Sequence, residues 1–163
     1  MRLLLTVANA LLSPRCGVGA TVVSHFRVLP SDVGLATFKS DRYFTAADAA
    51  QFDFAIRIGL LRPFLREGVR WVNLAQAGLF RRPLRLGQPF RVSTRVVCVD
   101  TRHMYIAHVF ESAGEVHAEL LVKLKFKKGR LTVPPQDLFP DAPVQRNASV
   151  EALDALHQTQ SSH

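Results

Sequence analysis

Residues 27–61 constrain the fold more than any other stretch of this chain. They begin as an extended, polar segment and continue as a helix of about four turns that is apolar around most of its circumference. After residue 69 the hydrophobic period changes to two, as in β-strands. One long helix followed by a run of strands predicts an α+β fold, in which an antiparallel β-sheet wraps around one long central helix.

Local signals indicate where this helix begins and ends. Ser40 is a candidate N-cap for a helix that begins at Asp41, and Thr45 with Asp48 three residues later is an equally good capping box. Gly59 is a candidate stop. Few polar residues lie in between, namely Asp48, Gln51, Asp53 and Arg57, so we expect the helix to be buried on most sides.

Strands are expected on both sides of the helix, and turn residues divide them into a meander of hairpins. The expected strands are residues 21–29, 69–79, 90–99, 104–111 and 116–126. In the last strand the even-numbered residues are apolar, whereas His117, Glu119, Lys123 and Lys125 are polar. One face of this strand therefore belongs to the core, and the other meets water or a partner.

The 163 residues, of which 48% are hydrophobic, are enough for one globular domain with its own core. We expect an N-terminal apolar helix and joint at residues 1–20, the domain at 21–139 and a C-terminal tail at 140–163. Residues 133–143 are rich in proline and are expected to be extended, and 149–157 to form a short helix.

The formal net charge of +8 favours anionic partners, namely nucleic acid, acidic lipid or a phosphate-bearing small molecule. Nucleic acid fits least well, because the basic residues are not interleaved with exposed aromatic residues. Cys16 and Cys98 are too far apart in the sequence to match the spacing of metal ligands, so they do not suggest a metal site. We expect both to be free thiols in the cytoplasm. His103, His108 and His117 are scattered over strands and are expected at the surface or at an interface.

The apolar N-terminus, residues 1–13, is too short to span a bilayer. A secretory signal fits its length, but Ser13, Pro14 and Arg15 stand where a cleavage site of small residues is expected. The other interpretations are a helix docked on this protein or on a partner subunit, and a helix that contacts a membrane surface beside Arg2 and Arg15.

The chain contains no nucleophile elbow, P-loop, dinucleotide fingerprint or zinc spacing. Candidate catalytic residues are Asp32, Ser40 and Asp41 in the turn before the helix, because backbone N–H groups at a helix start can polarise a carbonyl or bind an anion. Such residues also serve simply as helix caps. Both interpretations stay open on the residues alone.

Several residues near strand ends are candidates for substrate contacts. The pairs Arg81–Arg82 and Lys127–Lys128 could bind phosphates, or could be solvated strand ends. Trp71 is expected to pack in the core. Asn73, on the same face of its strand, is either a satisfied buried amide or a substrate contact.

The chain resembles the acyl-CoA thioesterases of the hotdog fold, in the 4-hydroxybenzoyl-CoA thioesterase-like group and its thioesterase-superfamily member 6 type. The resemblance covers roughly residues 1–139. It rests on the order and spacing of MRLLLTVANALLSPR, FRVLPSDV, RYF, FDFAIRIGLL, LFRRPLRLGQPFRVSTRVV and HVFESAGEVHAELLVKLKF.

This resemblance implies a homodimer or a dimer of dimers with active sites at the subunit interface. It implies an acyl-CoA substrate and no metal or further cofactor, since CoA is part of the substrate. An acidic residue would attack the thioester or activate a water, while backbone N–H groups at the helix start polarise the carbonyl. The substrate-binding residues would be Tyr43, Asn73, Arg81, Arg82 and Lys127.

The sequence departs from the family pattern in the turn before the helix. Asp32 matches the first acid of that pattern, whereas Gly34 stands where characterised relatives have a second acid that corresponds best to the catalytic one. The chain is one residue shorter before Tyr43, and if this gap is placed earlier, Asp32 itself fills the catalytic position. The His-Met-Asn-Asn run of relatives is absent, and Asp48 matches an acidic position on the family's helix that we interpret as orienting the backbone. The expected function is therefore hydrolysis of an acyl-CoA thioester, or, as the alternative, a non-catalytic acyl-binding or protein-interaction module.

Overall fold

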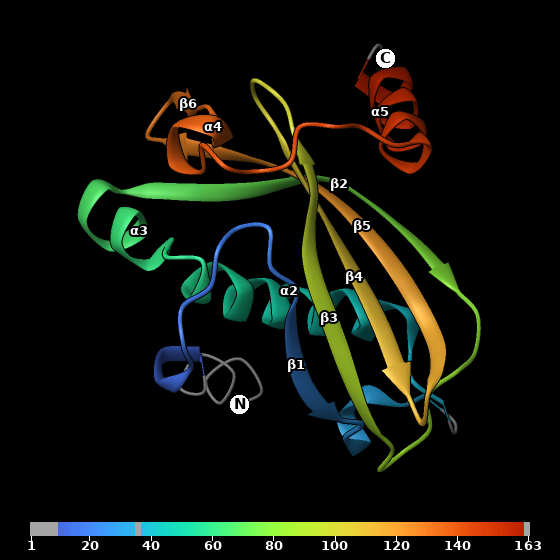
Figure 1. The fold of residues 1–163 in the computed structure, drawn as a ribbon. Helices are drawn as coiled ribbons and strands as arrows, with labels where there is room; N and C mark the ends of the chain where they lie inside the picture. Colours follow the sequence, from blue (N-terminus) through green and yellow to red (C-terminus); the bar gives the residue numbers. More distant parts are fainter. Residues whose placement is uncertain (1–9, 35–36, 162–163) are drawn as a thin grey trace.

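The structure is a computed structural model that describes residues 10–34 and 37–161, and it shows a curled sheet wrapped around one long helix (Figure 1). In chain order the elements are β1 (Val22–Arg27), η1 (Pro30–Asp32), α2 (Ser40–Arg57), α3 (Leu61–Glu67), β2 (Val69–Phe80), β3 (Pro89–Val99), β4 (Met104–Ser112), β5 (Glu115–Lys128), β6 (Leu131–Val133), α4 (Pro135–Leu138) and α5 (Ala148–Ser161). The predicted α+β arrangement is confirmed, with α2 as the central helix.

The sheet has six antiparallel strands in the order β1-β3-β4-β5-β2, and β6 pairs with the end of β5. β3, β4 and β5 form the predicted hairpins. The predicted meander is wrong for β2, which pairs with β5 at the far edge of the sheet. The loop after β2 passes over the start of α2, where Phe38 N donates to Leu84 O at 2.9 Å, and β3 then begins beside β1.

α2 begins at Ser40, the earlier of the two predicted starts, and Thr45 lies inside it with its hydroxyl donating to Asp41 O at 3.2 Å. The helix ends at Arg57, and Gly59 follows with a φ of +92°, a conformation that glycine adopts without strain. The side of α2 that faces the sheet carries small residues such as Ala46 and Ala50, both fully buried. Small side chains allow the helix to lie close to the sheet.

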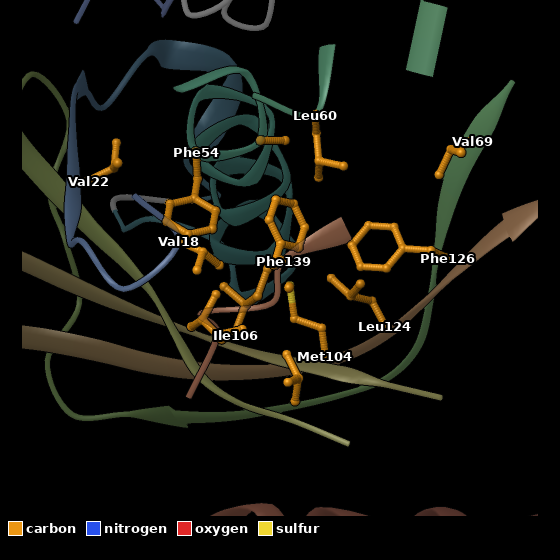
Figure 2. Close-up of a cluster of buried hydrophobic side chains, with 14 residues drawn as sticks. Val18, Val22, Phe54, Leu60, Val69, Met104, Ile106, Leu124, Phe126 and Phe139 are labelled. Carbon is orange, nitrogen blue, oxygen red and sulfur yellow. The ribbon is translucent and has the colours of Figure 1, made fainter. Parts of the chain in front are cut away.

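Two clusters of buried side chains fill the space between α2 and the sheet. Figure 2 shows the cluster at the C-terminal end of α2, where Phe54 packs with Leu124 and Phe126. The second cluster lies at the N-terminal half of the helix and includes Tyr43 and Phe110, whose ring centroids are 5.2 Å apart. The even-numbered residues of β5 contribute to both clusters, as its alternation predicts.

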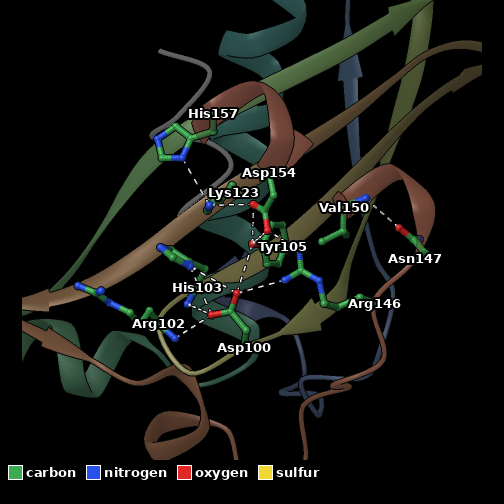
Figure 3. A network of polar contacts seen from close by, with 10 residues as sticks. All are labelled: Asp100, Arg102, His103, Tyr105, Lys123, Arg146, Asn147, Val150, Asp154 and His157. Atoms are coloured by element: carbon green, nitrogen blue, oxygen red, sulfur yellow. Dashed lines mark hydrogen bonds and ion pairs between the residues drawn. The ribbon is translucent and has the colours of Figure 1, made fainter. Parts of the chain in front are cut away.

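α5 covers part of the outer face of the sheet, which is the face turned away from α2 (Figure 1). A polar network holds α5 there (Figure 3). The carboxylate of Asp154 pairs with Lys123 at 2.8 Å and with Arg146, and accepts a hydrogen bond from the Tyr105 hydroxyl at 2.8 Å. Arg146 also pairs with Asp100 at 3.3 Å. The polar face of β5 thus meets a partner within its own chain.

The predicted surface positions of two histidines are wrong. His108 is fully buried, because the alternation of β4 points it inward under α2, and its Nδ1 lies 3.0 Å from Thr94 Oγ1. His117 is 7% exposed, because the loop after β2 covers it and Arg81 N donates to its carbonyl oxygen at 2.9 Å. His103 stays partly exposed in the turn between β3 and β4.

Some short elements were not predicted. α3, α4 and β6 are absent from the expectations, and α4 interrupts the segment that was expected to be extended. The predicted C-terminal helix is present and longer than expected. Cys16 and Cys98 are free thiols.

The predicted N-terminal apolar helix falls largely outside the described residues, which begin at Ala10. No helix within the described part of the chain is long and apolar enough to cross a membrane.

Candidate active site

The predicted catalytic residues lie around the start of α2. Asp32 closes η1 and is 5% exposed, and its Oδ2 accepts a hydrogen bond from Leu29 N at 2.9 Å. The carbonyl oxygen of Asp32 accepts a hydrogen bond from Lys39 N at 3.0 Å, which brings η1 against the start of α2. The Asp32 carboxylate is therefore buried and held by its own loop.

Ser40 and Asp41 form the first turn of α2, where both side chains are exposed. Asp41 pairs with Arg42 at 3.6 Å. Within the described residues the N–H groups of Ser40 and Asp41 make no backbone hydrogen bond, as is usual in a first helical turn. These two N–H groups, together with the positive end of the helix dipole, can donate hydrogen bonds to an anion or to a developing oxyanion.

Tyr43 is a core residue that ties α2 to the loop after β2. Its ring is 3% exposed, and its hydroxyl donates to Arg82 O and accepts from Leu84 N, both at 3.3 Å. Burial raises the pKa of Tyr43. All of these contacts are with its own chain.

The predicted phosphate-binding residues are not brought together within one chain. Arg81 and Arg82 follow β2 and pair with Glu119 at 2.7 Å and Glu115 at 2.9 Å. Lys127 lies at the opposite end of the β2–β5 pair, on the outer face. Two of the three cations thus already have carboxylate partners.

A polar cluster that sequence reasoning had not assembled lies where α2 meets β2. Gln51 Nε2 donates to Asn73 Oδ1 at 3.2 Å, and Asn73 Nδ2 donates to Asp48 Oδ1 at 3.4 Å. Asp48 is exposed at the surface, and partial desolvation of its carboxyl group raises its pKa. Gln51 is 3% exposed, and its Oε1 has no hydrogen-bond partner among the described residues. Buried polar atoms are rarely left without a partner, so this oxygen points to a functional position.

The backbone around Asn73 is irregular. The register of β2 with β5 shifts between Asn73 and Ala75, so Leu74 is an extra residue in the edge strand. Such bulges re-aim side chains and are frequent next to active sites. Asp48 and Gln51, which are three residues apart on a mostly apolar helix, were the sequence signal for this cluster.

An apolar groove lies between α2, α3 and the start of β2. It has a volume of about 180 Å³ and is lined only by apolar residues: Phe52, Ala55, Ile56, Leu60, Leu61, Phe64 and Trp71. Trp71 packs between Phe52 and Phe64, with ring centroids 4.8 and 6.0 Å away. A much smaller cavity shares Ala55, Leu60 and Trp71 with the groove, and Gln51 also lines it. Gln51 is therefore the member of the polar cluster that lies nearest to the groove.

No group of three potential metal ligands occurs among His, Cys, Asp and Glu of residues 10–34 and 37–161. The polar cluster instead consists of one carboxylate and two amides. Such a set can orient a water molecule or a carbonyl group but is poor in metal ligands.

Comparison with protein families and known sequences gives consistent matches. The model of a family described as the thioesterase-like superfamily matches residues 28–140. Protein THEM6 of Danio rerio is 32% identical over 120 residues, covering 72% of this chain and 59% of that protein. Protein THEM6 of Xenopus laevis is 33% identical over 84 residues, covering 51% of this chain and 41% of that protein. The chain thus spans about half the length of these relatives.

Solved structures share the fold at low sequence identity. A gentisyl-coenzyme A thioesterase superposes with a TM-score of 0.64 at 19% identity, covering 74% of this chain and all of that one. A hypothetical protein from Thermus thermophilus superposes with a TM-score of 0.67 at 22% identity, covering 82% of this chain and 98% of that one. A 1,4-dihydroxy-2-naphthoyl-CoA thioesterase from Synechocystis superposes with a TM-score of 0.64 at 12% identity, covering 75% of this chain and 97% of that one.

Proposed function

The chain belongs to the thioesterase-like superfamily and has the hotdog fold, and on that premise we propose that it binds and hydrolyses an acyl-CoA thioester at the junction of α2 and β2. One observation carries this proposal: the Asp48 carboxylate is held by Asn73, whose other partner, Gln51, lines a cavity that shares Trp71 with an apolar groove. A carboxylate beside an apolar groove suits a substrate with a reactive thioester and a hydrocarbon tail.

In the proposed complex the acyl chain lies in the groove beside Trp71. The lining is aromatic and aliphatic and offers no polar partner, so it selects an apolar tail. Phe64, which is 38% exposed on α3, stands at the mouth of the groove. CoA phosphates would then lie outside. The proposed cations for them are either Arg81 and Arg82, which would exchange Glu119 and Glu115 for phosphate, or Lys127 at the other end of the β2–β5 pair.

Asp48 is the proposed general base. Its raised pKa makes the carboxylate a stronger base, and the hydrogen bond from Asn73 orients it. Asp48 takes a proton from water as the water oxygen attacks the thioester carbon. The C–S bond of the tetrahedral intermediate then breaks, Asp48 returns the proton to the leaving sulfur, and the products are a carboxylic acid and the CoA thiol.

The oxyanion of the intermediate needs donors, and we propose the N–H groups of Ser40 and Asp41. Ser40 and Asp48 are eight residues apart on α2, which corresponds to about 12 Å along the helix axis. One chain therefore cannot present both to the same carbonyl. A homodimer that places the α2 start of one subunit near Asp48 of the other would complete the site.

Asp32 is the second candidate for the catalytic acid, because the family resemblance points to it. Its burial and its hydrogen bond from Leu29 N favour a role in holding the loop. The two roles predict different results on substitution by asparagine, which keeps the shape of the side chain but removes its charge.

The test is hydrolysis of acyl-CoAs of several chain lengths by the purified chain. Asp48→Asn should lower kcat by about 10²-fold or more, the usual contribution of a general base, with a much smaller change in KM. Asp137→Asn, at an exposed carboxylate of α4, is the matched control and should retain full activity. Full activity in Asp48→Asn together with a loss in Asp32→Asn would transfer the catalytic role to Asp32.

The alternative function is a non-catalytic module that binds acyl thioesters without hydrolysing them. Gly34, which replaces the second acid of relatives, favours it. A Cβ atom added at Gly34 would lie 3.6 Å from Lys39 Cε, an ordinary contact, so the position accepts a side chain. Under this alternative the wild-type chain binds acyl-CoA without turnover, and Gly34→Asp introduces turnover.

A further inference from the structure

A cavity lies on the opposite side of the sheet from the proposed active site. It is a groove of about 430 Å³ between α5 and the outer face of the sheet. Its floor comes from outward-pointing residues of the strands, including Leu79, Val97, Ala107, Val109 and Leu121. Its volume falls in the range of small-molecule sites.

One face of α5 forms the wall of this outer groove. Ser149, Ala152, Leu153 and Leu156 line it at helical spacing. The polar network of Asp154 and Lys123 seen in Figure 3 fixes α5 to the sheet beside the groove. Even so, Leu156 stays 61% exposed. The fold thus holds an apolar wall in place without filling the space in front of it.

Charged residues line the outer groove at both ends, with Arg95 at the β3 side and Glu119 opposite Leu79 at the β2 side. Arg95 on β3 and the start of α5, with Asn147 and Ser149, line it at the β3 side. Leu79 and Leu156 line it at the β2 side, where α5 contacts β2. From β3 across β4 and β5 to β2 is three strand spacings, or roughly 14 Å, the length of an extended alkyl chain of medium size.

The outer groove carries one uncompensated charge among its described lining residues. Arg95 is exposed and has no ion pair or side-chain hydrogen bond there. Glu119 also lines the groove, but Arg81 neutralises it at 2.7 Å. A free guanidinium at the end of an apolar trough matches a carboxylate on a hydrocarbon tail.

We propose that the outer groove binds a single-chain carboxylic acid, with the carboxylate on Arg95 and the tail between α5 and the sheet. This site is separate from the acyl-CoA site, because the sheet lies between them, and it does not depend on the proposed hydrolysis. Binding of the acid as a monomer, below the concentration at which it forms micelles, distinguishes a free acid from an anionic membrane as the ligand.

The probe is decanoate, measured by isothermal titration calorimetry on the full chain below the concentration at which it forms micelles. We expect one bound decanoate per chain. Arg95→Glu should weaken binding by at least about tenfold, since one charge-assisted hydrogen bond is lost and a like charge is introduced. Arg130→Glu makes the same charge change at an exposed turn residue and should leave binding unchanged.

A second pair of variants tests the tail. Ala152→Trp fills the outer groove from an exposed position of α5, whereas Ala155→Trp adds the same ring at an exposed position of α5 that does not line the groove. The first should abolish decanoate binding, and the second should preserve it. Neither position is buried, so both variants should fold.

Three results would overturn the proposal. Decanoate binding that survives both Arg95→Glu and Ala152→Trp would place the acid elsewhere. Equal binding of decyltrimethylammonium, which carries the opposite charge, would remove the role of Arg95. A chain that self-associates through this groove, so that Ala152→Trp halves its mass in light scattering, would make the groove an interface between copies.

Discussion

The buried polar residues of this protein differ in whether they are fully paired. Asp53 accepts three hydrogen bonds, whereas Gln51 and His108 each keep one buried side-chain atom without a partner among the described residues. Unpaired buried atoms cost free energy, so they persist where function or packing requires them. Gln51 lies in the proposed active site, whereas His108 does not. The burial of His108 instead makes the stability of the protein depend on pH.

His108 should make the protein less stable as the pH falls below 6.5. Burial lowers the pKa of His108 to about 3, from an ordinary value of 6.5. Between these values the unfolded chain binds a proton that the folded chain does not, so the free energy of unfolding falls by roughly 1.4 kcal/mol per pH unit. Above pH 6.5 this effect is absent.

Urea denaturation at several pH values between 6.5 and 4.5 measures this effect. Burial also lowers the pKa of His103, which contributes with the same sign. The comparison is therefore between the wild-type chain and His108→Leu, which should lack most of the slope. Parallel pH dependences of the two proteins would show that His108 is protonated in the folded state.

At the scale of elements, the buried carboxylate of Asp53 joins α2 to the edge strand β1 and forms an ion pair within α2. Asp53 on α2 is 2% exposed, accepts a hydrogen bond from Ser24 Oγ at 2.6 Å and pairs with Arg57 Nε at 2.6 Å. Asp53→Ala leaves Arg57 without its carboxylate and should lower the free energy of unfolding by about 3–5 kcal/mol. Ser24→Ala removes one hydrogen bond and should cost about 1–2 kcal/mol.

Chemical denaturation of both variants checks this prediction. A cost for Asp53→Ala no larger than that for Ser24→Ala would mean that the ion pair adds nothing beyond the serine contact.

α5 is held by the buried side chains of Val150 and Leu153 and by the ion pairs of Asp154. Burial alone would raise the pKa of Asp154, but hydrogen bonds from Lys123, Arg146 and Tyr105 lower it to about 2. Its contribution is therefore present above pH 3.8 and is lost as the pH falls through 2. At neutral pH, Asp154→Ala leaves Lys123, which is 4% exposed, without its carboxylate and should release α5.

Hydrogen–deuterium exchange locates this effect. Exchange should accelerate over α5 in Asp154→Ala, while β3, β4 and β5 stay protected. Glu151→Ala, at an exposed acid of the same helix, should leave the exchange of α5 unchanged. Faster exchange of the whole sheet would show instead that the network supports the core.

The sequence predicted the helices and strands better than it predicted which strands pair with one another. Helix α2 and the five long strands follow from periodicity, since each buries one face. The crossing of β2 to the far edge could not be read from local pattern, because pairing depends on where the loop at Leu84 passes over α2. For the same reason Asp48, Gln51 and Asn73 were seen separately but not as one cluster.

At the scale of the whole molecule, the proposed site requires a second subunit, and β2 offers a place for it. β2 is an edge strand whose exposed residues include Val72 at 43%, and unpaired edges are ready to pair with another chain. If two copies pair there, Val72→Lys should shift the mass in light scattering from dimer to monomer. Leu131→Lys, at a 72% exposed position at the start of β6, should leave the mass unchanged.

A monomeric wild-type chain at high concentration would contradict the proposed dimer. A dimer that Val72→Lys leaves intact would place the interface elsewhere on the surface.

The most direct test of the proposed function is a crystal structure of the chain with a non-hydrolysable acyl-CoA thioether. The tail should lie against Trp71 in the groove between α2 and α3, and the thioether should lie within reach of Asp48 of one subunit and of the α2 start of the other. A tail bound anywhere else, or a thioether beside Asp32 and distant from Asp48, would contradict this account.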